Sequence, residues 1–196
     1  MKRSVMFWLA IFASVLLLVF KFFEWQLVGL FTVFFLPVIW LVFYGFFIVA
    51  GVLSIVQWVR KKDWKPVTVI AVTTLLVFLI PFHQLAIQTD FYWNKQKRLE
   101  VIEQIDNQTL EPNVSHNDTL IELPTKYRSL SSGGDVVLEK QSDRLSVLFF
   151  TSRGVLDNFS GFVYSENGEE PDRRDFGGDF KEIVPMGEKW FFVSSS

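Results

Sequence analysis

The chain has 196 residues, of which half are apolar and 17% are aromatic, and its formal net charge is −2. The charge is uneven: residues 1–82 hold seven Lys/Arg and two Asp/Glu, whereas residues 83–196 hold 12 Lys/Arg and 19 Asp/Glu. This split excludes a soluble single-domain enzyme, a disordered chain and a nucleic-acid binder with an exposed basic domain. Because the sequence has no Cys, it also excludes disulfides, cysteine-based zinc sites and thiol nucleophiles.

Residues 5–20 form the first uncharged apolar run. As a helix this run is about 24 Å long, and the long side chains of Lys2, Arg3 and Lys21 extend it toward the ~30 Å hydrocarbon core. A cleaved signal peptide is the alternative interpretation, since a basic start before an apolar stretch is typical of one. No small residues follow the run, so we predict a retained anchor, linked to the next run by residues 21–24.

The second run, residues 25–59, is too long for one straight crossing and too short for two. Pro37 favours a bend, because proline removes a backbone donor and clashes with the preceding turn. We therefore expect residues 25–36 to be interfacial, tilted or re-entrant before the main crossing. The third run, residues 66–82, begins with Pro66, which the first turn of a helix tolerates.

The distribution of basic residues orients these spans. Residues 2–3 and 60–65 hold six Lys/Arg, whereas residues 21–24 hold one, beside an acid. Basic segments stay in the cytoplasm, so three crossings place the N-terminus inside and the C-terminal part outside. An exposed domain without Cys is typical of a bacterial envelope, and we expect a multi-pass protein of the cytoplasmic (inner) membrane with a periplasmic or extracellular domain.

Beyond the membrane region, 1–82, the sequence predicts three parts. Residues 83–106 favour an amphipathic extramembrane helix, and residues 107–118 favour a polar linker. Residues 119–196 favour a small β-rich domain with six short strands, at 119–123, 136–138, 145–150, 159–164, 181–184 and 189–193. The apolar face expected for the helix consists of Leu85, Tyr92, Leu99, Ile102 and Ile105. The predicted fold class is therefore a membrane α region, with three transmembrane helices, joined to an extramembrane α+β domain.

No residue pattern indicates catalysis, a cofactor or a metal. His116 and Asp118 have a spacing that two metal ligands can use, but the sequence offers no third ligand nearby, and His83 is expected to be wet at the interface. The triplet at residues 175–177 matches the kinase motif in letters only. Asn107, Asn113, Asn117 and Asn158 lie in glycosylation sequons, which we expect to be inert in a bacterial protein.

The apolar runs contain no ionisable residue, which disfavours an ion-coupled transporter. We expect hydrogen bonds from one helix to another to satisfy their polar side chains, which are Ser54, Gln57, Thr68, Thr73 and Thr74. A lining for a transport path is the alternative for these residues.

Aromatic residues alternate with Gly, Asn and Asp in the C-terminal domain. The partner-binding residues that we predict there are Asp157, Phe159, Phe162, Asp175, Trp190 and Phe192. For residues 190–193, whose rings lie on both faces of a strand, we expect core packing on both faces, and an exposed apolar edge used for binding is the alternative.

The predicted function is non-enzymatic binding by an integral membrane protein, with a subunit, assembly or immunity-type role. The expected partners are the lipid bilayer and another envelope protein, with no nucleic acid, and homo-oligomerisation stays open. The alternative is a membrane component that transports or senses small molecules through its helices. An enzyme that uses Asp157 or the loop at residues 172–179 is the third hypothesis.

Overall fold

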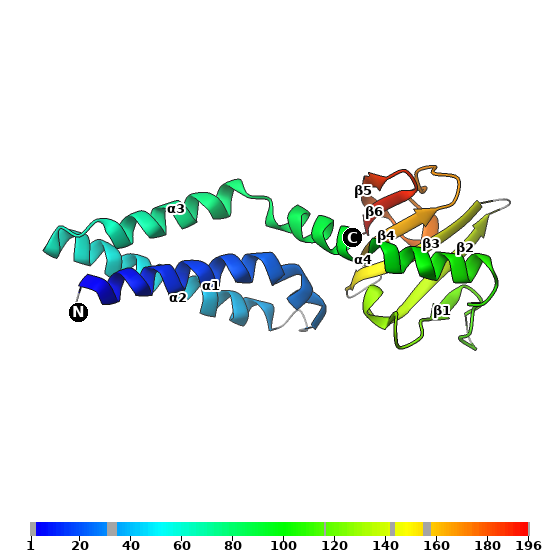
Figure 1. Cartoon of the computed structure of the whole chain (residues 1–196), viewed down its shortest axis with the longest axis horizontal. Coiled ribbons are helices and arrows are strands. Elements are labelled where there is room, and N and C mark those ends of the chain that lie inside the picture. The colour runs from blue at the N-terminus through cyan, green and yellow to red at the C-terminus, as the bar shows by residue number, and fades with distance from the viewer. Residues whose placement is uncertain (1–2, 31–34, 116, 142–143, 155–157, 196) are drawn as a thin grey trace. The chain divides into compact units, whose positions relative to one another are not determined.

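A computed structural model describes residues 3–30, 35–115, 117–141, 144–154 and 158–195 (Figure 1). The chain divides into two compact units, Met1–Ile87 and Gln88–Ser196. Each unit is described by itself.

The first unit contains three apolar helices, α1 (Arg3–Leu30), α2 (Leu36–Lys61) and α3 (Lys65–Leu79). The link expected at residues 21–24 is wrong, because α1 continues through it for another two turns. Nothing in this stretch breaks a helix, and Lys21 forms an ion pair with Glu24 one turn further along. Pro37 lies in the first turn of α2 rather than at a bend within a helix, a position that suits its missing N–H.

Within the part of the chain that the structure describes, two helices are long and apolar enough to cross a membrane: residues Val5–Glu24 of α1 and the whole of α2. At 15 residues α3 is only about 22 Å long, and it qualifies as a third span only in combination with α4 across a bent break. These described helices therefore provide two candidate spans, or three if α3 and α4 together form one bent span. Pro66 lies in the first turn of α3, as expected.

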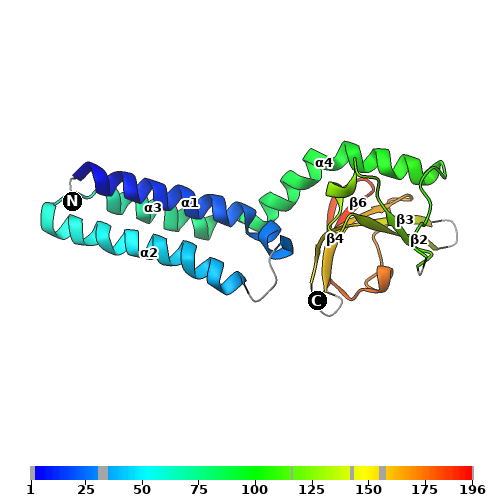
Figure 2. The ribbon, with the colours of Figure 1, turned by 90° about the horizontal axis from the view of Figure 1, so that it is seen from below.

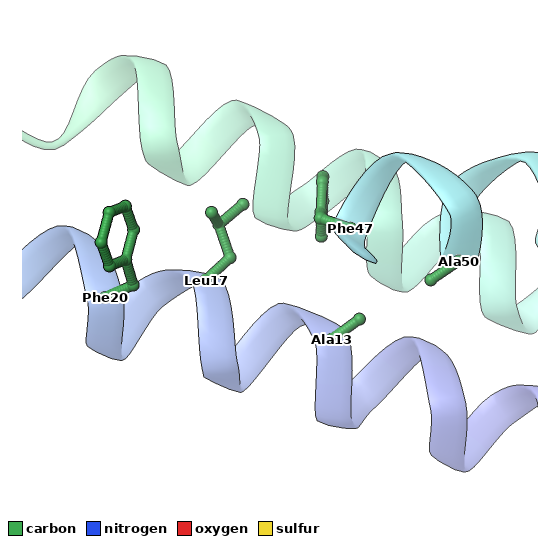
Figure 3. Packing of buried hydrophobic residues seen from close by; sticks show 5 residues of the cluster. All are labelled: Ala13, Leu17, Phe20, Phe47 and Ala50. Carbon is green, nitrogen blue, oxygen red and sulfur yellow. The ribbon is translucent and has the colours of Figure 1, made fainter. Parts of the chain in front are cut away.

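Small residues bring these helices together. Ala13 and Leu17 on α1 are buried against Phe47 and Ala50 on α2 (Figure 3). The ring of Phe20 stacks on that of Phe43, with their centroids 4.3 Å apart. Close approach of backbones at small side chains is how helices associate in lipid, where tails are as apolar as Leu. The outward faces carry a large set of exposed apolar residues, among them Phe12, Leu41, Ile48, Val59 and Phe78. Such a surface suits hydrocarbon rather than water.

The second unit contains most of α4 (Phe82–Asp106) and one antiparallel sheet. All six expected strands are present: β1 (Leu120–Glu122), β2 (Asp135–Gln141), β3 (Arg144–Arg153), β4 (Phe159–Ser165), β5 (Phe180–Gly187) and β6 (Trp190–Ser195). Their order across the sheet is β1-β2-β3-β4-β6-β5. Because β6 inserts between β4 and β5, residues 166–179 must cross one face of the sheet to reach β5. We call residues 166–179 the crossover segment.

Helix α4 lies across the other face of the sheet (Figure 2). The ring of Phe91 on α4 lies 5.3 Å from that of Phe162 on β4 and 5.6 Å from that of Trp190 on β6. The apolar face of α4 differs from the expected one, because Phe91 and Val101 are buried and Tyr92 is exposed. Arg98 is buried in the middle of this face. A pattern of apolar residues alone therefore predicts the wrong face of α4.

The crossover segment covers the opposite face. Leu148, Val163 and Val193 on that face form a buried cluster with Phe180, and Phe176 from the crossover segment packs against it. Both faces of the central strands are therefore covered, and Trp190, Phe191, Phe192 and Val193 are all buried. The expected core packing on both faces of this strand is what the structure shows, because a helix covers one side and an irregular segment covers the other.

Candidate functional site: the open edge of the sheet

The outer edge of β1 is closed by residues that precede it. The Asn113 side chain donates to the carbonyl of Glu122 at 3.1 Å and accepts from its N–H at 2.8 Å. The N–H of Asn113 donates to the carbonyl of Leu120, whose own N–H donates to the carbonyl of Asn117, each at 3.3 Å. These bonds occupy backbone groups that a bare edge strand leaves to other chains. Asn113 was singled out only as an inert sequon, and nothing in the sequence indicated this role.

The edge at β5 is different. Among the strands that the structure describes, β5 is bonded to β6 alone and ends the sheet. Lys181, Glu182, Val184 and Pro185 are exposed on it. We call residues 181–185 the open edge. Two irregularities in its pairing with β6, at residues 180–182 and 185–187, leave a short regular stretch between them.

Pro185 and the charged residues restrict what can bind at the open edge. Proline cannot donate to a new strand, and charged side chains on an edge suppress indiscriminate pairing. A partner strand would have to be short and to match the charges of Lys181 and Glu182. The open edge therefore favours a selective contact over aggregation.

A hollow of about 400 Å³ lies beside the open edge. Its wall on the β5 side consists of Phe180, Lys181, Glu182 and Ile183, and its other wall consists of residues 170–173 of the crossover segment. The lining is mostly charged, with Glu170, Asp172 and Glu182 against Arg173 and Lys181. Lys181 pairs with Asp179, whose pKa is lowered by the hydrogen bond from this lysine. Acidic groups outnumber basic ones around the hollow.

Asp175 holds the crossover segment in place. Its carboxylate forms an ion pair with Arg144 on β3 and accepts from the N–H of Asp172 at 2.9 Å. Next to it, Phe176 has a φ of 58°, a left-handed conformation that is unfavourable for a residue with a side chain. The N–H of Phe176 donates to Oε1 of Glu139 on β2 at 2.8 Å, which holds this turn against the sheet.

Glu139 lies in an unusual electrostatic environment. Burial raises the pKa of its carboxyl, the nearby Asp175 charge raises it further, and the bond from Phe176 and the charge of Arg144 oppose the rise. One oxygen, Oε2, is buried without a hydrogen-bond partner among the described residues. Glu139 therefore helps to hold the crossover segment through Phe176, and it does not line the hollow.

The residues predicted to bind a partner lie mostly in the interior. Phe162, Trp190, Phe192 and Asp175 are buried, so they do not form an exposed binding surface. Phe159 is half-buried and packs edge-on against Phe150 and Phe180. Asp157, like His116, lies outside the described residues. The structure brings together the open edge and the crossover segment, which the sequence reasoning had treated only as a strand and a charged loop.

The hydroxyl groups of the apolar helices bond within their own helices, contrary to the expected helix-to-helix bonds. Ser54, Thr68, Thr73 and Thr74 each donate to the carbonyl four residues earlier, at 2.7–3.1 Å. Such a bond satisfies a hydroxyl in hydrocarbon without any partner helix. Gln57 donates instead to Asp63, beyond the end of α2, at 3.2 Å. These polar groups are satisfied locally, which gives no support to a transport path.

Among the described residues, no group of three His, Asp or Glu side chains is placed to hold a metal ion. No protein-family profile, curated protein or solved structure matches the chain.

Proposed function

We propose that this chain is a non-enzymatic integral membrane protein whose β-rich domain binds another protein of the bacterial envelope by strand addition. The contrast between the two edges of the sheet carries the proposal. One edge is closed by Asn113, whereas the edge at β5 is open and lies beside a hollow of about 400 Å³. An extended segment paired with β5 would gain main-chain hydrogen bonds and could place one side chain in the hollow.

The charges of the domain favour a basic partner segment. Acidic side chains outnumber basic ones around the hollow, and residues 83–196 carry more Asp/Glu than Lys/Arg. Complementary charge accelerates encounter and rejects unsuitable partners more than it raises affinity. A subunit, assembly or immunity-type role is compatible with such a contact.

The proposed location is the cytoplasmic membrane, with the N-terminus inside and the β-rich domain outside. Arg60 and Lys61 at the end of α2, with Lys65 at the start of α3, supply the basic cluster that this orientation requires. Because the chain has no Cys, cysteines introduced singly at Lys65 and at Thr109 would report the two sides by labelling of intact cells. We expect labelling of T109C but not of K65C by a membrane-impermeant maleimide, and the reverse pattern would contradict this topology.

A photo-reactive amino acid placed in the full-length protein tests the binding edge. Replacement of Val184 by p-benzoylphenylalanine should give a discrete adduct with one envelope protein in native membranes. The same replacement at Glu122, on the closed edge, is the matched control and should give little adduct. Equal adducts from both positions, or none from Val184, would contradict binding at the open edge.

Reversal of charges around the hollow distinguishes specific binding of a basic segment from chance proximity of another membrane protein. The variant K181E/R173E makes the hollow wholly acidic and should strengthen capture of a basic segment, whereas E182K/E170K should weaken it severalfold. All four residues line the hollow and none belongs to the buried core. An adduct at Val184 that is insensitive to both variants would rule out the proposed complementarity.

A further inference from the structure

A second cavity lies in the membrane unit, at the end of the bundle where α1 passes Lys21. Its volume is about 450 Å³, within the range of small-molecule sites. It is lined by Lys21 and Glu24 from α1, Trp40 from α2, Val77 from α3, and residues 80–83 including His83. Phe7, near the N-terminal end of α1, and Trp64, at the N-terminal end of α3, line a separate hollow. The N-terminal ends of these two helices therefore also lie close together. The cavity thus lies at the end of the bundle that the proposed topology places outside the cytoplasm.

The cavity contains one cation and one anion in apolar surroundings. Lys21 and Glu24 form an ion pair, and their side chains are only 23% and 21% exposed. They lie within a continuous helix, at the end of the span Val5–Glu24, and not in a loop. Partly buried charges are rare within an apolar helix bundle, and where they occur they commonly pair with one another and mark a binding site.

We propose that this cavity binds the head group of a zwitterionic phospholipid of the phosphoethanolamine type. The phosphate would accept hydrogen bonds from the ammonium group of Lys21, and the primary ammonium of the head group would donate to the carboxylate of Glu24. Trp40, which is 44% exposed, offers the face of its indole to the ammonium and an amphipathic ring to the membrane interface. Val77, Ile80 and Phe82 provide apolar walls for the glycerol and the start of the acyl chains.

The balance of charge argues for this class over an anionic lipid. An anionic head group would satisfy Lys21 but would leave the Glu24 carboxylate facing negative charge. A choline head group would bring a cation without N–H donors, so it could not hydrogen-bond to the carboxylate. The shared chemistry, a phosphate beside a primary ammonium, also occurs in free phosphoethanolamine, but that molecule makes no use of the apolar walls.

Native mass spectrometry of the delipidated full-length protein in detergent tests the proposal. Dioleoyl phosphatidylethanolamine should bind at least about fivefold more tightly than the phosphatidylglycerol and phosphatidylcholine of the same chains. Free phosphoethanolamine should not compete at the same concentration. The variants K21M and E24Q should each remove the preference, and K65M, which removes a cation at the other end of the bundle, should retain it.

Two results would overturn the proposal: equal binding of the three lipids, or an unchanged preference in K21M and E24Q. Competition by free phosphoethanolamine would show that the cavity binds a soluble ligand, which would overturn the proposal that it binds a lipid. If either variant fails to fold, the swap K21E/E24K keeps an ion pair on the same helical turn. We expect the swap to lose the preference, and a swap that keeps it would also overturn the proposal.

Discussion

Arg98 donates to the carboxylate of Asp90, two turns earlier on α4, with Nη2 and Oδ2 2.6 Å apart. The guanidinium is almost completely buried and lies over the ring of Phe162, 4.4 Å from its centroid. Burial lowers the pKa of Arg98, and the charge of Asp90 opposes that change. A buried cation thus lies at the centre of the contact between the helix and the sheet, and a single carboxylate compensates it.

Removal of Asp90 should therefore cost more than removal of both charges. We expect D90A to destabilise the domain by about 3 kcal/mol, because it leaves a buried cation without its anion. The double variant D90A/R98M should recover at least half of that loss, since an apolar side chain fits the same space. Hydrogen exchange of β4 amides in the full-length protein measures both values. A double variant as unstable as D90A would contradict the explanation.

Protonation of Glu139 should stabilise the domain. The folded state holds the pKa of this carboxyl above its ordinary value, so the folded state binds the proton more tightly than the unfolded state. The contribution of Glu139 is therefore most favourable below the ordinary pKa, and stability is lost as the pH rises through the raised value. The variant E139Q should remove this part of the pH dependence and should gain stability relative to the wild type between pH 5 and 7.

Unfolding by urea at several pH values checks this expectation, with E122Q on the exposed rim as the control. A difference between E139Q and the wild type that stays constant from pH 4 to pH 7 would show that Glu139 does not titrate as described.

Gly161 on β4 should not tolerate a side chain. A Cβ at this position would clash with the carbonyl oxygen of Phe149 and would lie 2.7 Å from Cδ1 of Leu148 on β3. This close approach occurs next to the bulge at residues 150–152. We expect G161A to cost about 1–3 kcal/mol, because the neighbouring strand must shift. G45A, whose Cβ would meet nothing within 4 Å, is the control and should change stability little.

The hydroxyls of Thr73 and Thr74 bond to the carbonyls of Val69 and Ile70 on their own helix, so they are dispensable. We expect T73V/T74V to insert into the membrane and to retain the adduct at Val184. The measurement is membrane fractionation followed by the cross-linking assay. If this variant instead abolished uptake or sensing of a solute, the alternative of a path through the helices would replace the binding function.

The sequence determined the elements that depend on local patterns. Uncharged apolar runs predicted the apolar helices, alternating short runs between Gly-rich turns predicted all six strands, and Pro66 predicted the start of α3. The charges at residues 21–24 predict a boundary that the structure does not have, because α1 continues through them. A charged pair one turn apart is nevertheless compatible with a helix, as Lys21 and Glu24 show.

Only the tertiary structure decided which surfaces remain available. The order of the strands cannot be read from alternation, because alternation defines two faces but not the neighbours of a strand. Insertion of β6 between β4 and β5 buried Trp190 and Phe192, which are among the residues predicted to bind a partner, and left β5 outermost. Closure of β1 by Asn113 and anchoring of the crossover segment by Asp175 are likewise contacts between residues 9 to 31 positions apart. Such long-range contacts leave no periodic signal, and they place the candidate site.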